Sequence, residues 1–401
     1  MPRHGTPGTT HARSRAVRVG RSALAVVSST GLACVLLVLL GVLTWLGTLA
    51  QVELGLYAAQ QRYFESFGLV HHAGPVPIPL PGGMLVLVLL AVNLIVGGLL
   101  RLRRGLATLG VLVAHVGILM LLAAGLVKTL CAREGHVTLH EGESAAHFES
   151  WQRWELAITE PIDGGRAREL VVPEERFLQA REGAAARLRS AELPFEIEVE
   201  RFLANCEPAP ADAVAHVGST VDGVFLREKP RDPTAERNLA GAHVTLVDRA
   251  SGARRSGLVW AAERAPFVAE VGGRRFAIEL RHERYPMPFT LTLDEFRKED
   301  HPGTGMARSF ESDVRVVEGA AARPVRISMN QPLRAGGLVV YQASWGPSNA
   351  RPGEPLFSTF AVVSNPSDAW PLWSCVVIAA GLVFHFGRKL GRHVRAEARR
   401  A

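Results

Sequence analysis

Long apolar runs near both ends of the chain frame a middle region in which apolar and polar residues alternate. Three of these runs lie at about 22–50, 83–100 and 105–127, and a fourth lies at 370–386. A helix that crosses the hydrocarbon core of a bilayer needs about 20 such residues. The pattern therefore predicts an integral membrane protein with about four transmembrane helices.

The middle region, 128–369, has the pattern of a folded domain outside the membrane. Short stretches alternate with period two and are separated by Gly-Gly, Asp-Gly and Pro-Gly pairs, which is typical of antiparallel strands joined by turns. The clearest stretches are 195–202, 242–248, 276–280, 289–293, 313–317, 325–328 and 338–341. We expect a large, mostly antiparallel β domain, a sandwich or a barrel, with a longer helix considered only near 174–190.

Positive charge lies beside the apolar runs. The N-terminal segment 1–21, the turn between the second and third runs (Arg101, Arg103, Arg104) and the tail 388–401 are all basic. Loops rich in Lys and Arg stay on the cytoplasmic side, and four spans place these three segments on one side. We therefore expect a multi-pass protein of the plasma (inner) membrane, with both termini cytoplasmic and the β domain, 128–369, extracytoplasmic.

The same distribution explains the formal net charge of +7 without nucleic acid. The chain has no zinc-finger spacing and no interleaving of basic and aromatic residues typical of nucleic-acid modules. No nucleic acid is expected as a partner. The chain also lacks the GxSxG, HExxH, P-loop and GxGxxG signatures, so no catalytic residue is assigned.

The outer loop at 51–82 has two parts. In 55–67, apolar residues recur at helical spacing, which predicts an amphipathic helix on the membrane surface. The proline-rich stretch 75–81 cannot be helical throughout and is expected to be an extended connector.

His115 is the most informative polar residue. It lies about ten residues into the third apolar run, which predicts a position near the middle of the membrane. An ionisable group there is costly and usually functional. Its imidazole has three open roles: ligating haem iron, carrying protons, or hydrogen-bonding a neighbouring helix. Gly110 and Gly117 flank it and would let a flat cofactor or a helix approach closely.

His385 is the other histidine within a span. It lies near the basic end of the fourth run, so its depth should differ from that of His115 by about 12 Å. Two imidazole nitrogens on opposite sides of one iron lie only about 4 Å apart. These two residues are therefore not expected to share a haem, and a second ligand would come from elsewhere. His385 itself is expected to reach toward the interface.

The remaining candidates are weaker. Loop residues His71 and His72 are expected to be solvated, Asn93 to hydrogen-bond a neighbouring helix, and Cys34 and Cys375 to pack within spans. His136, His140 and His147 are expected on strands, too far apart for a metal site.

The cysteines lack the CxxC and CxxCH patterns of a redox dithiol or a covalent haem site. Cys131 and Cys206 both fall within the predicted outer domain. They would pair only in an oxidising compartment and only if their Cα atoms approach.

Local motifs resemble the ResB family of cytochrome c biogenesis proteins over roughly 22–387. They include Thr44–Gln51, Arg62–Ser66, His115-Val-Gly-Ile-Leu, Gly135–Glu143, Phe289–Phe296, His301–Val314, Ile327–Arg334, Tyr341–Ser344 and Asn365-Pro366. The segment His301–Val314 is the most specific of them. The order of four spans with one large outer domain is also similar.

The resemblance implies a haem-handling subunit of a System II cytochrome c synthetase. Such proteins act with a CcsA/ResC-type membrane partner that carries a tryptophan-rich haem-handling segment, absent from this chain. The pair moves haem b transiently across the bilayer and presents it to apocytochrome c, and the attachment chemistry belongs to the partner. His115 corresponds to the family's transmembrane axial ligand of haem iron. This chain would then be a non-catalytic or co-catalytic subunit of a haem lyase complex.

Two alternatives come from other classes of protein. One is a membrane-anchored scaffold whose outer β domain positions a partner and which binds no haem. The other is a membrane redox enzyme, which the lack of a second mid-membrane histidine disfavours.

Overall fold

The computed structural model describes residues 24–103, 105–162, 165–181, 183–211, 220–263, 265–303, 307–347 and 354–400. The chain forms two compact units. The helical unit comprises the chain before Arg133 and after Ser364, and the β unit is Arg133–Ser364. The basic N-terminal segment 1–21 and Arg104 lie outside the described residues.

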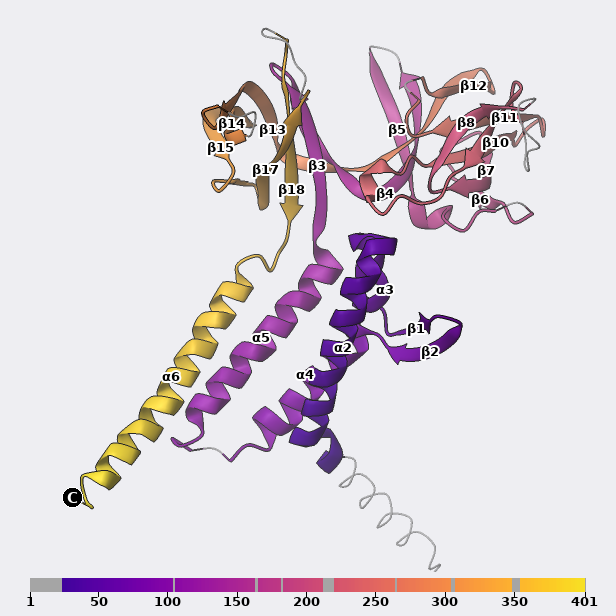
Figure 1. Cartoon of the computed structure of the whole chain (residues 1–401). Coiled ribbons are helices and arrows are strands. Elements are labelled where there is room, and N and C mark those ends of the chain that lie inside the picture. The colour runs from indigo at the N-terminus through magenta and orange to yellow at the C-terminus, as the bar shows by residue number, and fades with distance from the viewer. Residues whose placement is uncertain are drawn as a thin grey trace, which may run out of the picture. The chain divides into compact units, whose positions relative to one another are not determined.

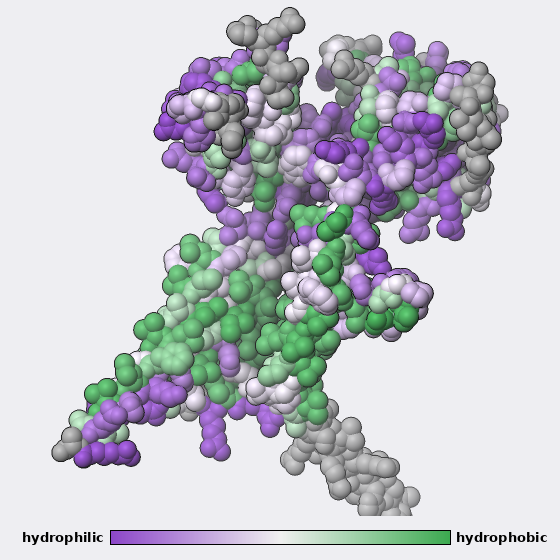
Figure 2. All heavy atoms as spheres, in the orientation of Figure 1, coloured by the Kyte–Doolittle hydropathy of each residue, from purple (hydrophilic) through white to green (hydrophobic). Residues whose placement is uncertain are grey.

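Within the described residues, four helical segments of the helical unit are long and apolar enough to cross a membrane. They are α2 (Thr30–Leu54), α4 (Gly83–Asn93) continued by the π-helical turn η1 (Leu94–Leu100), α5 (Leu109–Cys131) and α6 (Trp370–Glu397). Apolar side chains cover most of their visible surface, and hydrophilic residues appear on the last part of α6 (Figure 2). The predicted class, a membrane protein with four transmembrane helices and a β domain, is confirmed.

The second span is attached to the start of the first by a buried amide. Asn93 is 8% exposed, and its Nδ2 donates to the backbone oxygens of Val27 (2.6 Å) and Ser29 (3.0 Å). The Ser29 side chain in turn accepts from the Leu32 amide at 3.1 Å and caps α2. The predicted interhelical hydrogen bond of Asn93 is confirmed, and it fixes the end of α4 against the start of α2.

Helices α5 and α6 pack through small residues. Gly110, Ala114 and Gly117 are buried on α5, and Gly381 is buried on α6. A Cβ atom at Gly381 would lie 2.6 Å from the Ala114 nitrogen and 2.6 Å from the Gly110 oxygen. Backbone atoms cannot move aside as a flexible side chain can, so this contact requires glycine.

Gly381→Ala is therefore expected to weaken the α5–α6 contact by about 1–3 kcal/mol, the usual cost of overpacking. The measurement is the melting temperature of the detergent-solubilised chain. Gly387→Ala is the matched control, because a Cβ at this position of the same helix meets no atom within 4 Å. Equal melting temperatures for the two variants would contradict the packing account.

The segment between α2 and α4 folds into a short helix and a hairpin. Helix α3 (Leu56–Tyr63) confirms the helix predicted within 55–67. Strands β1 (Gly68–Ala73) and β2 (Val76–Pro81) pair antiparallel (Figure 1). The prolines of β2 occupy alternate positions, so the amides missing from that strand all belong to one edge. The predicted extended connector is thus one strand of a hairpin.

The β unit contains antiparallel strands only, among the residues that the structure describes. Its elements are β3 (Arg133–His140), β4 (Ser144–Ile162), β5 (Arg166–Pro173), η2 (Glu174–Arg176), β6 (Ala186–Leu188), β7 (Phe195–Leu203), β8 (Cys206–Pro210), β9 (Val224–Glu228), η3 (Ala235–Arg237), β10 (Gly241–Asp248), β11 (Arg254–Trp260), β12 (Phe267–Val271), β13 (Arg274–Asp300), β14 (Ala307–Glu318), β15 (Ala321–Ser328), β16 (Leu333–Ala335), β17 (Leu338–Gly346) and β18 (Phe357–Ser364). The helix considered at 174–190 is absent from the described residues of that stretch. The short 3-10 turn η2 and strand β6 lie there instead.

Two hydrophobic cores divide the β unit into lobes. The first lobe packs β6, β7, β10 and β11 against parts of β4, β12 and β13, around Phe195 and Phe276. The second lobe, around Phe289 and Phe360, contains β3, β14, β15, β16, β17 and β18 with the remaining parts of β4 and β13. The long strands β4 and β13 therefore run through both lobes.

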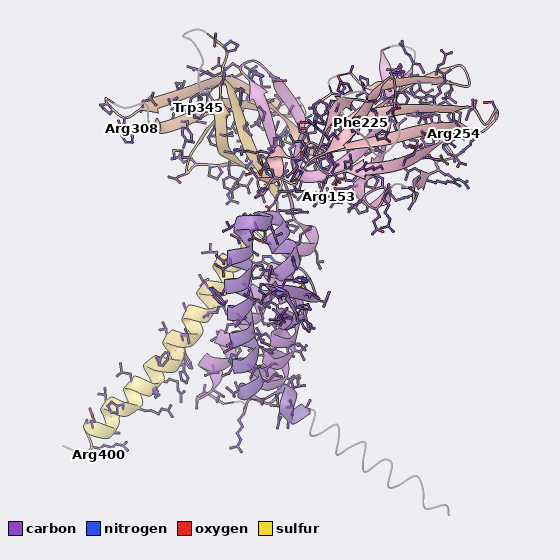
Figure 3. All side chains as sticks on the ribbon, turned by 45° about the vertical axis from the view of Figure 1, so that its right-hand side comes forward. Arg153, Phe225, Arg254, Arg308, Trp345 and Arg400 are labelled. Atoms are coloured by element: carbon purple, nitrogen blue, oxygen red, sulfur yellow. The ribbon has the colours of Figure 1, made fainter. Side chains whose placement is uncertain are left out.

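The joint between the lobes is a bulge in these shared strands. The register of β13 on β4 shifts between His282 and Arg284. On β4, the Ser150 hydroxyl accepts from the amides of Gln152 (3.3 Å) and Arg153 (3.1 Å). Figure 3 shows Arg153 at this joint, between the lobe that carries Trp345 and the lobe that carries Phe225.

Candidate functional site

Helix α5 packs against α6 on one side, and His115 lies on another side of α5. Gly110 and Gly117 face α6, whereas the half-buried ring of His115 lies against η1. His115 is the seventh residue of α5, because this helix begins at Leu109 and not at 105 as predicted. The residue therefore lies closer to the Arg103 end of the span than to its middle.

The partner of His115 is a backbone carbonyl. Its Nδ1 lies 3.2 Å from the oxygen of Gly98. A carbonyl oxygen only accepts, so Nδ1 must carry the proton. A neutral imidazole protonated on Nδ1 has a lone pair on Nε2. Among the residues that the structure describes, no hydrogen bond occupies that Nε2.

This arrangement suits a metal ligand. Ligating histidines commonly donate their other ring N–H to a carbonyl or carboxylate, which fixes the tautomer and makes the ligand more basic. Haem iron accepts such an imidazole as an axial ligand. The residues present therefore fit one iron–imidazole bond from His115 Nε2.

His385 is closer to His115 in depth than the sequence predicts. Its Cβ would lie 2.8 Å from a Cβ built on Gly110, five residues before His115 on α5, which is about 7.5 Å along the axis. The two positions are also about 140° apart around α5 at 3.6 residues per turn. The expected difference in depth of about 12 Å is too large, and the two side chains lie on different sides of α5.

His385 packs beside α5. It is half-buried, and its Nδ1 is buried without a hydrogen-bond partner among the described residues. Helix α6 continues to Glu397, so its basic residues follow His385 on the same helix. This explains why the apolar run ends before the helix does.

His71 has a structural partner. The Tyr63 hydroxyl lies 2.8 Å from His71 Nδ1, and Arg62 Nη2 donates to the Val70 oxygen at 2.6 Å. Both bonds attach the β1–β2 hairpin to α3. His71 and its neighbour His72 belong to strand β1 and not to an irregular loop.

Two histidines of the β unit, His136 and His282, lie close together in a stack of aromatic rings that the sequence does not predict. His136 stacks on Trp151 with ring centroids 4.2 Å apart, and His282 stacks on Trp154 at 3.9 Å. The two imidazoles meet edge to face at 6.2 Å. Their proximity depends on the bulge at the joint between the lobes, which no local pattern predicts.

Among the described residues, no group of three or more His, Cys, Asp and Glu side chains could hold a metal ion. Burial lowers the pKa of both His136 and His282, which keeps the imidazoles neutral at pH 7. As predicted, His136 and His140 lie on a strand, β3, and His147 lies on β4.

The β unit is expected to lose stability as the pH falls from 7.5 to 5.5. Burial lowers the pKa of His136, His147, His243 and His282 below the ordinary value of 6.5. The unfolded chain therefore binds more protons in this range, and the free energy of unfolding falls with the pH. The measurement is hydrogen exchange of β-unit peptides in the full chain.

The double variant His136→Gln/His282→Gln is expected to flatten this pH dependence. His140→Gln is the matched control, because His140 is exposed on the same strand as His136. A pH dependence as steep in the double variant as in the control would contradict the assignment.

The four cysteines are free thiols. Cys131 is the last residue of α5 and belongs to the helical unit, so its predicted place in the outer domain is wrong. Cys206 is buried in the β unit, where burial raises the pKa of its thiol to about 12. A thiol with so high a pKa is protonated and unreactive at pH 7.

Comparisons with known proteins place a family match in the β unit. Residues 267–354 match the model of the ResB-like family. A stretch of 89 residues is 34% identical to the "Cytochrome c biogenesis protein CcsB" of Synechococcus sp. (strain RCC307), and covers 20% of this chain and 20% of that protein. The chain thus spans about a fifth of the length of this curated relative. The resemblance inferred from the motifs is confirmed, although the family match does not include His115.

Proposed function

We propose that this chain, whose residues 267–354 match the ResB-like family, is a haem-handling subunit of a System II cytochrome c synthetase. It acts with a CcsA/ResC-type membrane partner to move haem across the bilayer and present it to apocytochrome c. The observation that carries the proposal is the Nδ1–Gly98 hydrogen bond of His115, because it leaves Nε2 as a lone-pair donor within a membrane-spanning segment.

The chain supplies one iron ligand, and the partner supplies the other. His385 does not provide the second one, because it packs at Gly110 on another side of α5. Asn93 is occupied by two backbone oxygens of the first span. Bound haem b is therefore held between the two proteins and is released when it reaches the cytochrome.

The basic residues indicate the orientation of the spans in the membrane. Arg101 and Arg103 follow η1, and Arg388, Lys389 and Arg392 lie in the last part of α6. The ends of these spans stay in the cytoplasm under the positive-inside rule. The β unit is then extracytoplasmic, on the side where the apocytochrome receives haem.

The β unit serves as the docking domain for the apocytochrome or the partner. Its family match, 267–354, lies in β12–β17, so the ResB-like part of the sequence belongs to this unit. The described carboxylates and histidines of the unit form no metal cluster. Docking is the role that we propose for this unit.

The proposal is tested by the haem content of the full chain purified with and without its partner from cells that mature c-type cytochromes. We expect haem b in the complex, detected as a pyridine haemochrome, and failure of cytochrome c maturation when the chain is deleted. A complex that supports maturation but carries no haem under any preparation would favour the scaffold alternative.

A further inference from the structure

We propose that Gly98, through its backbone oxygen and its missing side chain, is the positioning residue that orients His115 for iron. This inference rests on the proposed function, because it concerns the same ligand. Gly98 belongs to a different span from His115 and lies 17 residues before it. It contributes no side chain, so residue type alone does not mark it as part of the site.

The π-helical turn makes the Gly98 oxygen available. In η1 the Arg101 amide donates to the Val96 oxygen at 3.1 Å, five residues back, and this bond closes the turn. Carbonyls in the last turn of a helix have no donor within that helix. The Gly98 carbonyl is one of these, and the His115 N–H satisfies it. π-Helical turns are rare in proteins and are frequent at functional sites.

The missing side chain makes room for the ring. A Cβ atom at Gly98 would lie 2.7 Å from His115 Nδ1 and 3.2 Å from its Cε1. It would also lie 3.0 Å from Leu94 Cδ1. Any larger residue at this position must push the imidazole away from the carbonyl, so one residue provides both the hydrogen-bond acceptor and the space.

The π-helical turn cannot move away from His115, because its opposite side packs against the first span. A Cβ at Gly97 would lie 2.8 Å from the Ser28 backbone oxygen. Asn93, one turn earlier, bonds the oxygens of Val27 and Ser29. The Gly97-Gly98 pair thus allows two close contacts, Gly97 with the first span and Gly98 with the third.

The hydrogen bond has an electronic consequence that simple packing lacks. Donation from Nδ1 to a carbonyl increases the basicity of Nε2 and strengthens its bond to iron, and losing such an outer partner weakens metal binding by about 10–100-fold. A more basic imidazole favours the ferric state. Loss of the bond should therefore raise the reduction potential of the haem.

The test compares Gly98→Ala, Gly97→Ala and wild type, each as the full chain purified with its partner. We expect Gly98→Ala to lose haem about 10–100-fold more readily and to show a more positive reduction potential in the haem that remains. Gly105→Ala, which meets no atom within 4 Å, is the matched control for the substitution itself. Gly97→Ala, whose Cβ would meet the Ser28 backbone oxygen, shows the effect of displacing the turn without placing an atom beside the His115 ring.

Two results would overturn the inference. One is a Gly98→Ala complex with wild-type haem retention and potential, while His115→Ala loses its haem. The other is a Gly105→Ala complex whose potential shifts as far as that of Gly98→Ala. If the wild-type complex holds no haem, the proposed function fails separately from this inference.

A second measurement covers the case in which Gly98→Ala does not fold. Nitrogen-15 NMR of the wild-type chain labelled at histidine, with His115 assigned by comparison with His115→Ala, reports its tautomer without haem. We expect the proton on Nδ1. A proton on Nε2 would mean that the Gly98 oxygen does not accept from this ring, and would exclude the proposed role.

Discussion

His115→Ala is expected to abolish cytochrome c maturation while the chain still accumulates and binds its partner. The reason is that, in the proposed function, Nε2 of His115 is the iron ligand that this chain contributes within its spans. Haem retention by the purified complex should fall by more than about 100-fold, since losing the ligand exceeds the 10–100-fold cost of losing a ligand's outer partner. The measurement is the level of holocytochrome c in cells, normalised to the level of the chain.

His385→Ala is the matched control. His385 is also a half-buried histidine within a membrane helix, but it faces Gly110. This variant is expected to retain maturation. Equal loss in both variants would indicate that maturation requires packing of the helical unit and not a ligand at His115.

Arg281→Ala is expected to destabilise the β unit by about 3–5 kcal/mol, the cost of leaving a buried charge without its partner. Arg281 Nε lies 2.8 Å from Glu155 Oε1, and their side chains are 11% and 3% exposed. Its Nη1 also reaches Glu169 (2.8 Å) and Glu279 (2.7 Å). Burial raises the pKa of Glu155 in spite of the adjacent guanidinium, which indicates how strongly desolvation acts on this carboxylate.

The measurement is hydrogen exchange of β13 peptides in the full chain. Arg284→Ala is the matched control on the same strand, because its partner Glu149 and Arg284 itself are about one-third exposed and such pairs contribute about 0–1 kcal/mol. Arg281→Met combined with Glu155→Leu should recover most of the loss, since an apolar pair of similar volume avoids desolvation. A cost below about 1 kcal/mol for Arg281→Ala would contradict the account of a buried ion pair.

The helical unit and the β unit have different roles in the proposed function. The helical unit provides a ligand held between spans, with Gly98 on one side of His115 and the α6 contact on another side of α5. The β unit joins two cores through the continuous strands β4 and β13 and provides docking surface outside the membrane. A resident catalytic centre is not required of either unit in this scheme.

Elements that depend on local patterns were predictable from the sequence. The four apolar runs, the antiparallel strands and the helix at α3 all follow from periodicity within a few neighbouring residues. Asn93 was also predictable, because an amide within a span must find a partner. The location of β2 was predictable as extended chain, because alternate prolines exclude helix.

Features that depend on pairing between distant segments were not predictable. The π-helical turn at Leu94–Leu100 has the composition of any apolar helix, so the acceptor for His115 was missed. The position of His115 along its helix was misjudged because 105–108 is apolar enough to resemble helix but forms a turn before Leu109. The stack of His136 and His282 requires the β4–β13 register, which no single stretch specifies.

The most direct test of His115 as the haem ligand is an absorbance spectrum of the complex with the CcsA/ResC-type partner, for wild type and for His115→Ala, with and without added imidazole. The account predicts the Soret and α bands of a b-type haem in wild type, their loss or strong alteration in His115→Ala, and their return with imidazole. An unchanged haem spectrum in His115→Ala would contradict the account and leave His115 as a structural residue bonded to Gly98.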